Sequence, residues 1–199
     1  MGTRNVTIII QNGETKVRQY GQWDGYPTTA LRRICEVLKN HLPELEENVR
    51  RCRLVKENLT QSLRESSISR KAISAFEKIS DSVMYDHTLY RGNFDSEREW
   101  FEHLCHEFPA KDVQDYILQT RDTGYIIVED IATCPFDGEL LMPDCKITRI
   151  GGKGFSVVAI NTIDLDKREI RAEWHDKKST WSFANLPSDE ELEKFEALS

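Results

Sequence analysis

The sequence lacks the features of a membrane-bound or secreted protein. Its longest apolar run near the start, residues 6–10, contains Thr7 and falls far short of the roughly 20 residues that span a bilayer. The N-terminus has no long apolar core typical of a secretory signal, and Val6 stands where a myristoylation motif requires Ser or Thr. We therefore expect a cytoplasmic protein that makes no membrane contact.

The sequence also lacks an excess of basic residues. The 199 residues include 27 Lys and Arg against 34 Asp and Glu, which gives a formal net charge of −7 at pH 7. This balance excludes a broadly basic nucleic-acid-binding protein, so we expect no direct contact with nucleic acid. Apolar residues make up 39% of the chain, which is too many for a disordered protein.

Paired cysteines are lacking as well. An odd number of cysteines at irregular spacing indicates reduced thiols that mostly serve as small core residues. No Cys-x-x-Cys pair is present, so a zinc ribbon has no support. The five cysteines are Cys35, Cys52, Cys105, Cys134 and Cys145.

Neither a metal centre nor a phosphate-binding loop emerges from the motifs. His103 and His106 lie near Glu99 and Glu102, but on a helix Cys105 would face the core and only His–Glu pairs would remain. The glycine-rich turn at 151–154 precedes a strand, whereas a P-loop follows a strand and opens a helix. We predict no metal and no cofactor.

The negative charge is concentrated in two segments. Residues 93–108 and residues 188–199 each carry a net charge of −4, so the rest of the chain sums to +1. The segments are either solvated helical faces or a surface for a basic partner. On the second interpretation the binding candidates are Asp95, Glu99, Glu102, Glu190 and Glu193.

The N-terminal part predicts a β-hairpin followed by a helix. Strands at 6–10 and 15–20 flank Asn12-Gly13, a dipeptide that suits a type I′ turn. Glycines and a proline in residues 21–27 end the second strand. Thr28 or Thr29 then caps a predicted helix over 30–40, whose apolar residues share one face.

The middle of the chain reads as largely helical. Apolar spacing of three or four predicts helix over much of 43–90, including Cys52, with a serine-rich connection at 62–71. Further helices are predicted after Asp95 or Ser96 up to Pro109 and over 111–120. Residues 125–132 suit a buried strand or a short helix, and we favour the helix.

The C-terminal part predicts strands and a final helix. Strands at 155–160 and 169–174 flank a turn at 164–168, a third strand covers 180–183, and Ser188 and Glu191 have the spacing of a capping box. We predict a single α+β domain over 1–199. Its antiparallel sheet would combine the N- and C-terminal hairpins, covered by a helical insertion at about 43–120.

An aromatic turn is the part of the sequence that most needs an explanation. Tyr20, Trp23, Asp24 and Tyr26 lie within seven residues, next to Gly25 and Pro27. Aromatic side chains anchor either a packed corner or a binding site. A short carboxylate beside aromatic rings would suit a base, a sugar or a cationic side chain.

The ends of the chain resemble a group of largely uncharacterised bacteriophage and mobile-element proteins. The resemblance rests on the opening Met-Gly-Thr-Arg, a hairpin, and Trp-Asp-Gly-Tyr-Pro at 23–27. Residues 121–124 and 158–166 resemble later segments of the same group. The departure comes after Pro27, where similar proteins continue with small residues and this chain begins a helix. No agreed activity follows from membership.

The resemblance suggests a non-enzymatic accessory protein of a phage or mobile element. Such proteins often bind a host component in the host cytoplasm, and counter-defence (anti-CRISPR-like) inhibition is one such role. Our leading hypothesis is a protein that binds a host or defence protein, with acidic helices acting as a decoy for a nucleic-acid-binding groove.

Two alternatives come from other functional classes. The opening looks like that of N-terminal-nucleophile hydrolases, but loss of Met1 would expose Gly2, which carries no nucleophile. Further processing to Thr3 would supply one; otherwise the site is inactive or the likeness accidental. The second alternative is a small-ligand sponge that holds a nucleotide at the aromatic turn. The sequence does not determine the oligomeric state.

Overall fold

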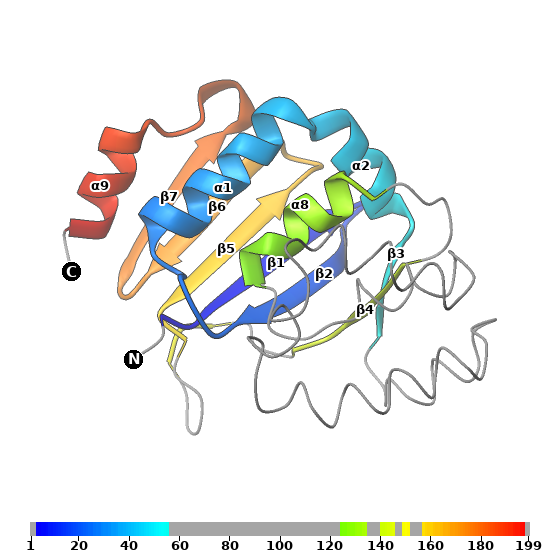
Figure 1. Cartoon of the computed structure of the whole chain (residues 1–199), viewed down its shortest axis with the longest axis horizontal. Helices are drawn as coiled ribbons and strands as arrows, with labels where there is room; N and C mark the ends of the chain where they lie inside the picture. Colours follow the sequence, from blue (N-terminus) through cyan, green and yellow to red (C-terminus); the bar gives the residue numbers. More distant parts are fainter. Residues whose placement is uncertain (1–2, 56–123, 135–139, 146–148, 152–156, 198–199) are drawn as a thin grey trace, which may run out of the picture.

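The protein has an α+β fold built on a five-stranded mixed sheet (Figure 1). The computed structural model describes residues 3–55, 124–134, 140–145, 149–151 and 157–197. The sheet has the strand order β2-β1-β5-β6-β7, and β3 and β4 form a second, two-stranded sheet. The strands are β1 (Asn5–Gln11), β2 (Glu14–Gly21), β3 (Cys52–Val55), β4 (Leu140–Pro143), β5 (Ala159–Asp164), β6 (Glu169–Trp174) and β7 (Lys177–Ser182). The helices are α1 (Pro27–Asn40), α2 (Leu42–Arg50), η1 (Gly124–Ile126), α8 (Ile127–Ala132), η2 (Phe183–Asn185) and α9 (Asp189–Ala197).

The predicted N-terminal hairpin is confirmed. β1 and β2 pair antiparallel, and Asn12 and Gly13 at the turn have φ values of 56° and 71°. Positive φ at both positions is the requirement of a type I′ turn. Asp166, in the turn between β5 and β6, accepts hydrogen bonds from the N–H groups of Asn12 and Gly13, each at 2.8 Å. The N-terminal hairpin is therefore joined to the turn between β5 and β6.

The predicted purely antiparallel sheet is wrong at one pairing. β1 and β5 run parallel, with Asn5 opposite Ala159 and Ile9 opposite Ile163. Within each hairpin a short turn imposes antiparallel pairing, but the two hairpins are separated by a long connection that permits either direction. The sequence contains no signal for that choice.

Four helices of the described residues lie over one face of the sheet. α1, α2 and α8 pack over the strands, and α9 lies beside α1 near β7 (Figure 1). α1 begins at Pro27, so the prediction that Thr28 or Thr29 caps it is wrong. Proline suits the first helical position because its φ is fixed near the helical value, and Tyr26 serves as the N-cap without a side-chain hydrogen bond.

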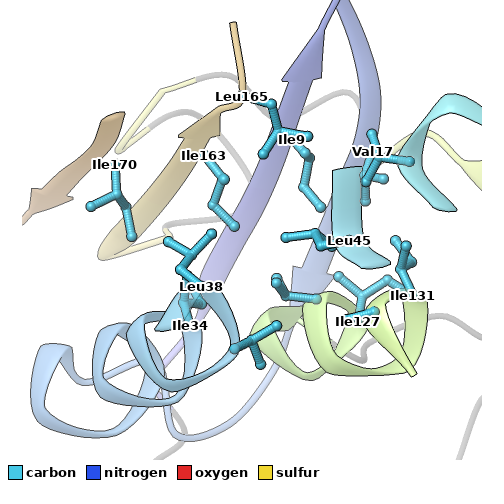
Figure 2. Packing of buried hydrophobic residues seen from close by; sticks show 14 of the residues in the cluster. Ile9, Val17, Ile34, Leu38, Leu45, Ile127, Ile131, Ile163, Leu165 and Ile170 are labelled. Carbon is cyan, nitrogen blue, oxygen red and sulfur yellow. The ribbon is translucent and has the colours of Figure 1, made fainter. Parts of the chain in front are cut away.

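The main core lies between the sheet and these helices (Figure 2). Ile9 and Ile163 from neighbouring strands are fully buried against Ile34 of α1, Leu45 of α2 and Ile127 of α8. Because side chains alternate along a strand, Val6 and Ile160 point to the other face, where they form a smaller cluster with Val157.

The middle of the chain is only partly helical in the described residues. α2 and the helix predicted over 125–132, observed as η1 and α8, agree with the prediction. Cys52 instead begins β3, which pairs in parallel with β4. The helix predicted at Cys52 is therefore wrong, because a strand partner distant in the sequence leaves no local signal. Most of the predicted helix over 43–90, and the helices over 95–109 and 111–120, lie outside the described residues.

The C-terminal strands and helix largely follow the prediction. β5 begins at Ala159, so the strand lies about four residues later than predicted, and the β5–β6 hairpin and β7 are present. Ser188 and Glu191 form the expected capping box, and the hydrogen bonds from Ser188 lower the pKa of the Glu191 carboxyl. Leu192 is buried and Phe195 packs on Trp181.

None of the helices in the described ranges combines the length and the apolar character that a membrane crossing requires. Cys35 and Cys52 are buried free thiols. Burial raises the pKa of the Cys35 thiol to about 11 and raises that of Cys52 further. Thiols of this kind are protonated at neutral pH and are poor nucleophiles, which agrees with the prediction of core cysteines.

The Asp166 contact makes part of the stability dependent on pH. The two backbone hydrogen bonds lower the pKa of the Asp166 carboxyl, so the stabilisation is complete above the unfolded-state pKa. It is lost as the pH falls through the lower folded-state pKa. Asp166→Asn should therefore reduce the free energy of unfolding at pH 7, and the difference from wild type should shrink as the pH falls below about 4. Denaturant unfolding across this pH range measures the difference.

Asp176→Asn, which removes the same charge in the β6–β7 turn, is the matched control. An equal pH-dependent loss in both variants would show that net charge, and not the contact with Asn12 and Gly13, is responsible.

Candidate functional site

The aromatic turn between β2 and α1 exposes two large side chains. Trp23 is 58% exposed and Tyr26 is 43% exposed, and among the described residues no other large hydrophobic side chain is as exposed. Asp24 between them is also exposed and has a φ of 53°, a left-handed conformation that aspartate tolerates better than most residues. The predicted alternative of a packed corner therefore does not describe Trp23 and Tyr26.

A buried amide fixes the path of this turn. Asn5, which is fully buried on β1, donates from Nδ2 to the carbonyl oxygens of Gly21 at 3.4 Å and Trp23 at 3.2 Å. The N–H of Gly25 donates to the carbonyl oxygen of Thr3 at 3.1 Å. These bonds hold the backbone on both sides of Asp24, so the exposed rings project from a fixed turn.

Three glycines surround Asn5 at close range. A Cβ atom at Gly25 would lie 2.6 Å from the Cβ of Asn5, and one at Gly21 would lie 2.8 Å from Nδ2 of Asn5. Gly124, at the start of η1, would place a Cβ 2.9 Å from the Asn5 Oδ1. Only residues without a side chain allow the turn and η1 to approach the strand this closely.

Tyr26 contacts an aromatic residue at the end of β6. The ring centroids of Tyr26 and Trp174 are 5.8 Å apart, and Trp174 stacks edge-on against the exposed His175 at 4.6 Å. The Nε1–H of Trp174 donates to the carbonyl oxygen of Glu196 at 3.3 Å. The turn, the end of β6 and the end of α9 thus form one surface. We call it the turn surface, made of Trp23, Asp24, Tyr26 and His175. The exposed acids Glu190 and Glu193 lie on the same helix α9, nearer its start.

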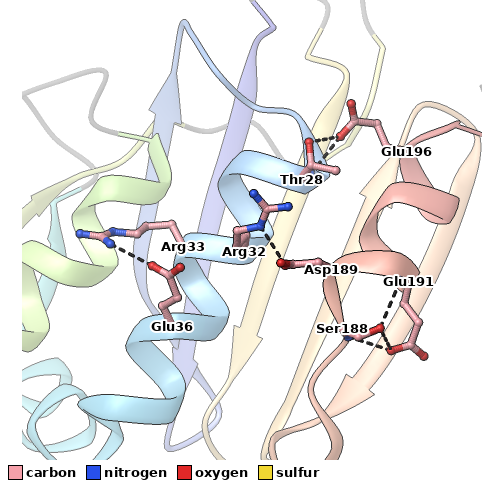
Figure 3. A network of polar contacts seen from close by, with 8 residues as sticks. All are labelled: Thr28, Arg32, Arg33, Glu36, Ser188, Asp189, Glu191 and Glu196. Carbon is pink, nitrogen blue, oxygen red and sulfur yellow. Dashed lines mark hydrogen bonds and ion pairs between the residues drawn. The ribbon is translucent and has the colours of Figure 1, made fainter.

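The acids of α9 divide into those that hold the helix, several of which Figure 3 shows, and those that are exposed. The Glu196 carboxylate accepts from the N–H of Thr28 at 2.9 Å and from its hydroxyl at 2.6 Å. Asp189 pairs with Arg32 at 2.9 Å, farther along α1. Glu190 pairs within the helix with Lys194 and is 76% exposed, and Glu193 is also exposed. Part of the acidity therefore has a structural role.

A pocket of about 430 Å³ lies beside the turn surface, between α1 and α8. Arg33 crosses it, with ion pairs to Glu129 at 2.7 Å and Glu36 at 2.9 Å, and both carboxylates raise the pKa of the Arg33 guanidinium. Burial, and then the charge of Asp24, raises the pKa of the Tyr125 hydroxyl on the pocket wall. The arginine charge here is already matched by carboxylates, which disfavours an anionic ligand.

The structure separates the other predicted site residues from the turn surface. Tyr20 is half-buried and packs with the cluster of Val6 and Ile160 on the opposite face of the sheet. Asp95, Glu99 and Glu102 lie outside the described residues, as do His103 and Cys105. Within the described ranges no three His, Cys, Asp or Glu side chains are grouped closely enough to hold a metal ion.

The sequence-based prediction missed the residues that position the turn surface. Asn5 lies in an ordinary strand pattern, and Trp174 and His175 lie about 150 residues from the turn. Asn5 directly precedes the predicted strand at 6–10, and no local pattern marks its amide as buried, although a buried amide requires hydrogen-bond partners.

The glycine at position 25 provides a direct test of how the turn is held. Its φ is not in the left-handed region, so the cost of Gly25→Ala is the steric conflict with the Asn5 Cβ and the Thr3 carbonyl oxygen. We expect a loss of about 1–3 kcal/mol in the free energy of unfolding. We also expect a shift in the fluorine NMR resonance of fluorotryptophan at position 23, assigned by its absence in Trp23→Phe.

Gly13→Ala is the control, because nothing lies within 4 Å of a Cβ at that position and only the left-handed backbone, with a φ of 71°, is strained. It should lower stability without moving the Trp23 resonance. An unmoved resonance in Gly25→Ala would show that the contact with Asn5 does not fix the turn.

Comparisons with family models, with curated proteins and with solved structures found no match to this chain.

Proposed function

We propose that this chain is a non-enzymatic binding protein that engages a basic protein partner through the turn surface. The observation that carries the proposal is the exposure of Trp23 and Tyr26 on a turn held by a buried amide. Exposed aromatic residues are the side chains that most often dominate the energy of protein interfaces. If the two rings served only to pack the fold, burial would be expected, because burying apolar surface is favourable.

The fixed backbone of the turn favours binding. Asn5 and the Gly25–Thr3 hydrogen bond restrain the residues that carry the two rings. A segment that is already ordered loses less conformational entropy when a partner binds, so more of the contact energy contributes to affinity. The ring of Tyr26 also packs against the ring of Trp174.

The charge near the rings favours a basic partner. Asp24 lies between the two aromatic residues, and α9, whose end contacts Trp174, carries the exposed acids Glu190 and Glu193. A nucleic-acid-binding groove of a host or defence protein offers the complementary combination of positive charge and stacking surfaces. Together with the resemblance to phage and mobile-element proteins, this supports a counter-defence inhibitor. Asp95, Glu99 and Glu102 remain predicted contributors.

The alternative of an N-terminal-nucleophile hydrolase requires Thr3 to become the first residue. Thr3 is buried, and its carbonyl oxygen accepts a hydrogen bond from the N–H of Gly25. Thr3 therefore helps to hold the turn in place. Intact-mass measurement of the purified protein distinguishes the two: a chain starting at Thr3 would favour the enzyme, and a longer chain would leave it without a nucleophile.

Removing the two exposed rings should abolish partner binding. The chain is co-expressed with candidate nuclease and defence complexes, captured at physiological salt, and the recovered pair is reconstituted from purified proteins. Trp23→Ala with Tyr26→Ala should raise Kd by roughly a hundredfold or more, since anchor residues contribute about 2 kcal/mol or more each. Trp23→Tyr, which keeps a ring, should lose less. Recovery of no partner, or unchanged affinity in the double variant, contradicts the proposal.

Reversing the outward acids should slow association. Glu190→Lys with Glu193→Lys should reduce the association rate constant by roughly tenfold at low salt, and the difference from wild type should fade as salt screens the charges. The control is Glu44→Lys with Glu47→Lys, which reverses two exposed acids on α2 at the opposite end of α1. Equal slowing by both pairs would indicate a general effect of net charge and would remove α9 from the interface.

A further inference from the structure

The turn surface carries a carboxylate that the chain itself leaves unpaired. Asp24 is exposed, and its side chain has no ion pair and no hydrogen bond among the described residues. Its charge contributes, after burial, to the raised pKa of the Tyr125 hydroxyl, so the two side chains lie near each other. An unpaired carboxylate on an exposed turn is available to a cationic group of a partner.

The arginines of the pocket beside the turn surface do not neutralise Asp24. Arg32 and Arg33 both line that pocket. Arg32 pairs with Asp189 at 2.9 Å, and Arg33 pairs with Glu129 at 2.7 Å. Because these charges are balanced inside the chain, a cation that neutralises Asp24 has to come from another molecule.

The ring of Trp23 is available for stacking. It is 58% exposed and makes no ring contact among the described residues, whereas the ring of Tyr26 packs against Trp174. Asn5 holds the backbone of the turn through the Trp23 carbonyl oxygen. The face of an aromatic ring attracts a cation, and a planar guanidinium also stacks on it. An exposed ring next to an unpaired carboxylate therefore offers the two groups that a guanidinium binds best.

We propose that the turn surface imitates a nucleotide and thereby binds an arginine side chain of its protein partner. The Trp23 ring takes the place of a base, and the Asp24 carboxylate takes the place of a phosphate. Arginines of nucleic-acid-binding proteins stack on bases and form paired hydrogen bonds with phosphates. Lysine lacks the planar group, so arginine is favoured. The inference rests on the proposed binding of a basic partner and adds the side chain that is recognised.

The same charges disfavour a bound nucleotide at this turn. The phosphate of a nucleotide stacked on Trp23 would lie near the Asp24 carboxylate. It would also approach the end of α9, where the Glu196 carboxylate is bound to Thr28. Repulsion between these anions would oppose binding. The small-ligand alternative is therefore less favourable at the turn than an arginine.

The test follows the fluorine NMR resonance of fluorotryptophan at position 23 in the full chain during titration with peptides at low salt. Hexa-arginine should shift this resonance, with a Kd lower by roughly threefold or more than that of hexalysine, which carries the same charge. Hexacitrulline, which has nearly the shape of hexa-arginine without its charge, should cause no shift.

Asp24→Asn should weaken hexa-arginine binding by roughly fivefold, because one charge pair is lost. Asparagine also tolerates the left-handed backbone at this position, where φ is 53°, so the fold should be kept. Unmoved resonances of the other fluorotryptophans check this. Glu44→Gln is the matched control, because it removes the same charge at an exposed position on α2 and should leave Kd within about twofold.

The inference is overturned if hexa-arginine at millimolar concentration leaves the Trp23 resonance unmoved, if hexalysine binds as tightly, or if Asp24→Asn and Glu44→Gln weaken binding equally. A shift with adenosine monophosphate but not with hexa-arginine would also overturn it. In each of these cases, a partner whose capture is lost in Trp23→Ala with Tyr26→Ala would still support the proposed function, so the two failures are distinguishable.

Discussion

The buried amide of Asn5 is the contact on which the candidate interface depends. It lies at the first residue of β1, where three segments converge: the end of β2, the turn before α1 and the start of η1. Its side-chain hydrogen bonds cross from the strand to the turn, and glycines at positions 21, 25 and 124 give it room. Without this contact the exposed rings would have no fixed support, and their ordering on binding would oppose affinity.

The acidic residues have different roles in different parts of the structure. In α9, Asp189 and Glu196 attach the helix to α1, and Glu191 caps its own helix, so these acids stabilise the fold. Glu190 and Glu193 are exposed on the same helix. Asp24 has no ion pair among the described residues and lies near Tyr125. A single net charge therefore describes none of these roles, because each is set by which side chains the fold brings together.

The elements that local patterns govern were predictable. Asn12-Gly13 specified the first hairpin, apolar spacing specified α1, and the capping box marked the start of α9. Two of the errors arose where the competing information was distant in the sequence. The parallel pairing of β1 with β5 and the strand that begins at Cys52 both depend on partners more than 80 residues away. The choice between a packed corner and an exposed turn at Trp23 was open for the same reason.

By itself the sequence determined the fold class, most of the described hairpins and helices, and the aromatic turn as a candidate site. These follow from turn chemistry and hydrophobic periodicity, which act over a few residues. Tertiary structure alone decided that Trp23 and Tyr26 are exposed, that Tyr20 faces the opposite side of the sheet, and that Asp24 lies near Tyr125. Exposure and charge clustering depend on which distant segments pack together, and no local pattern encodes that packing.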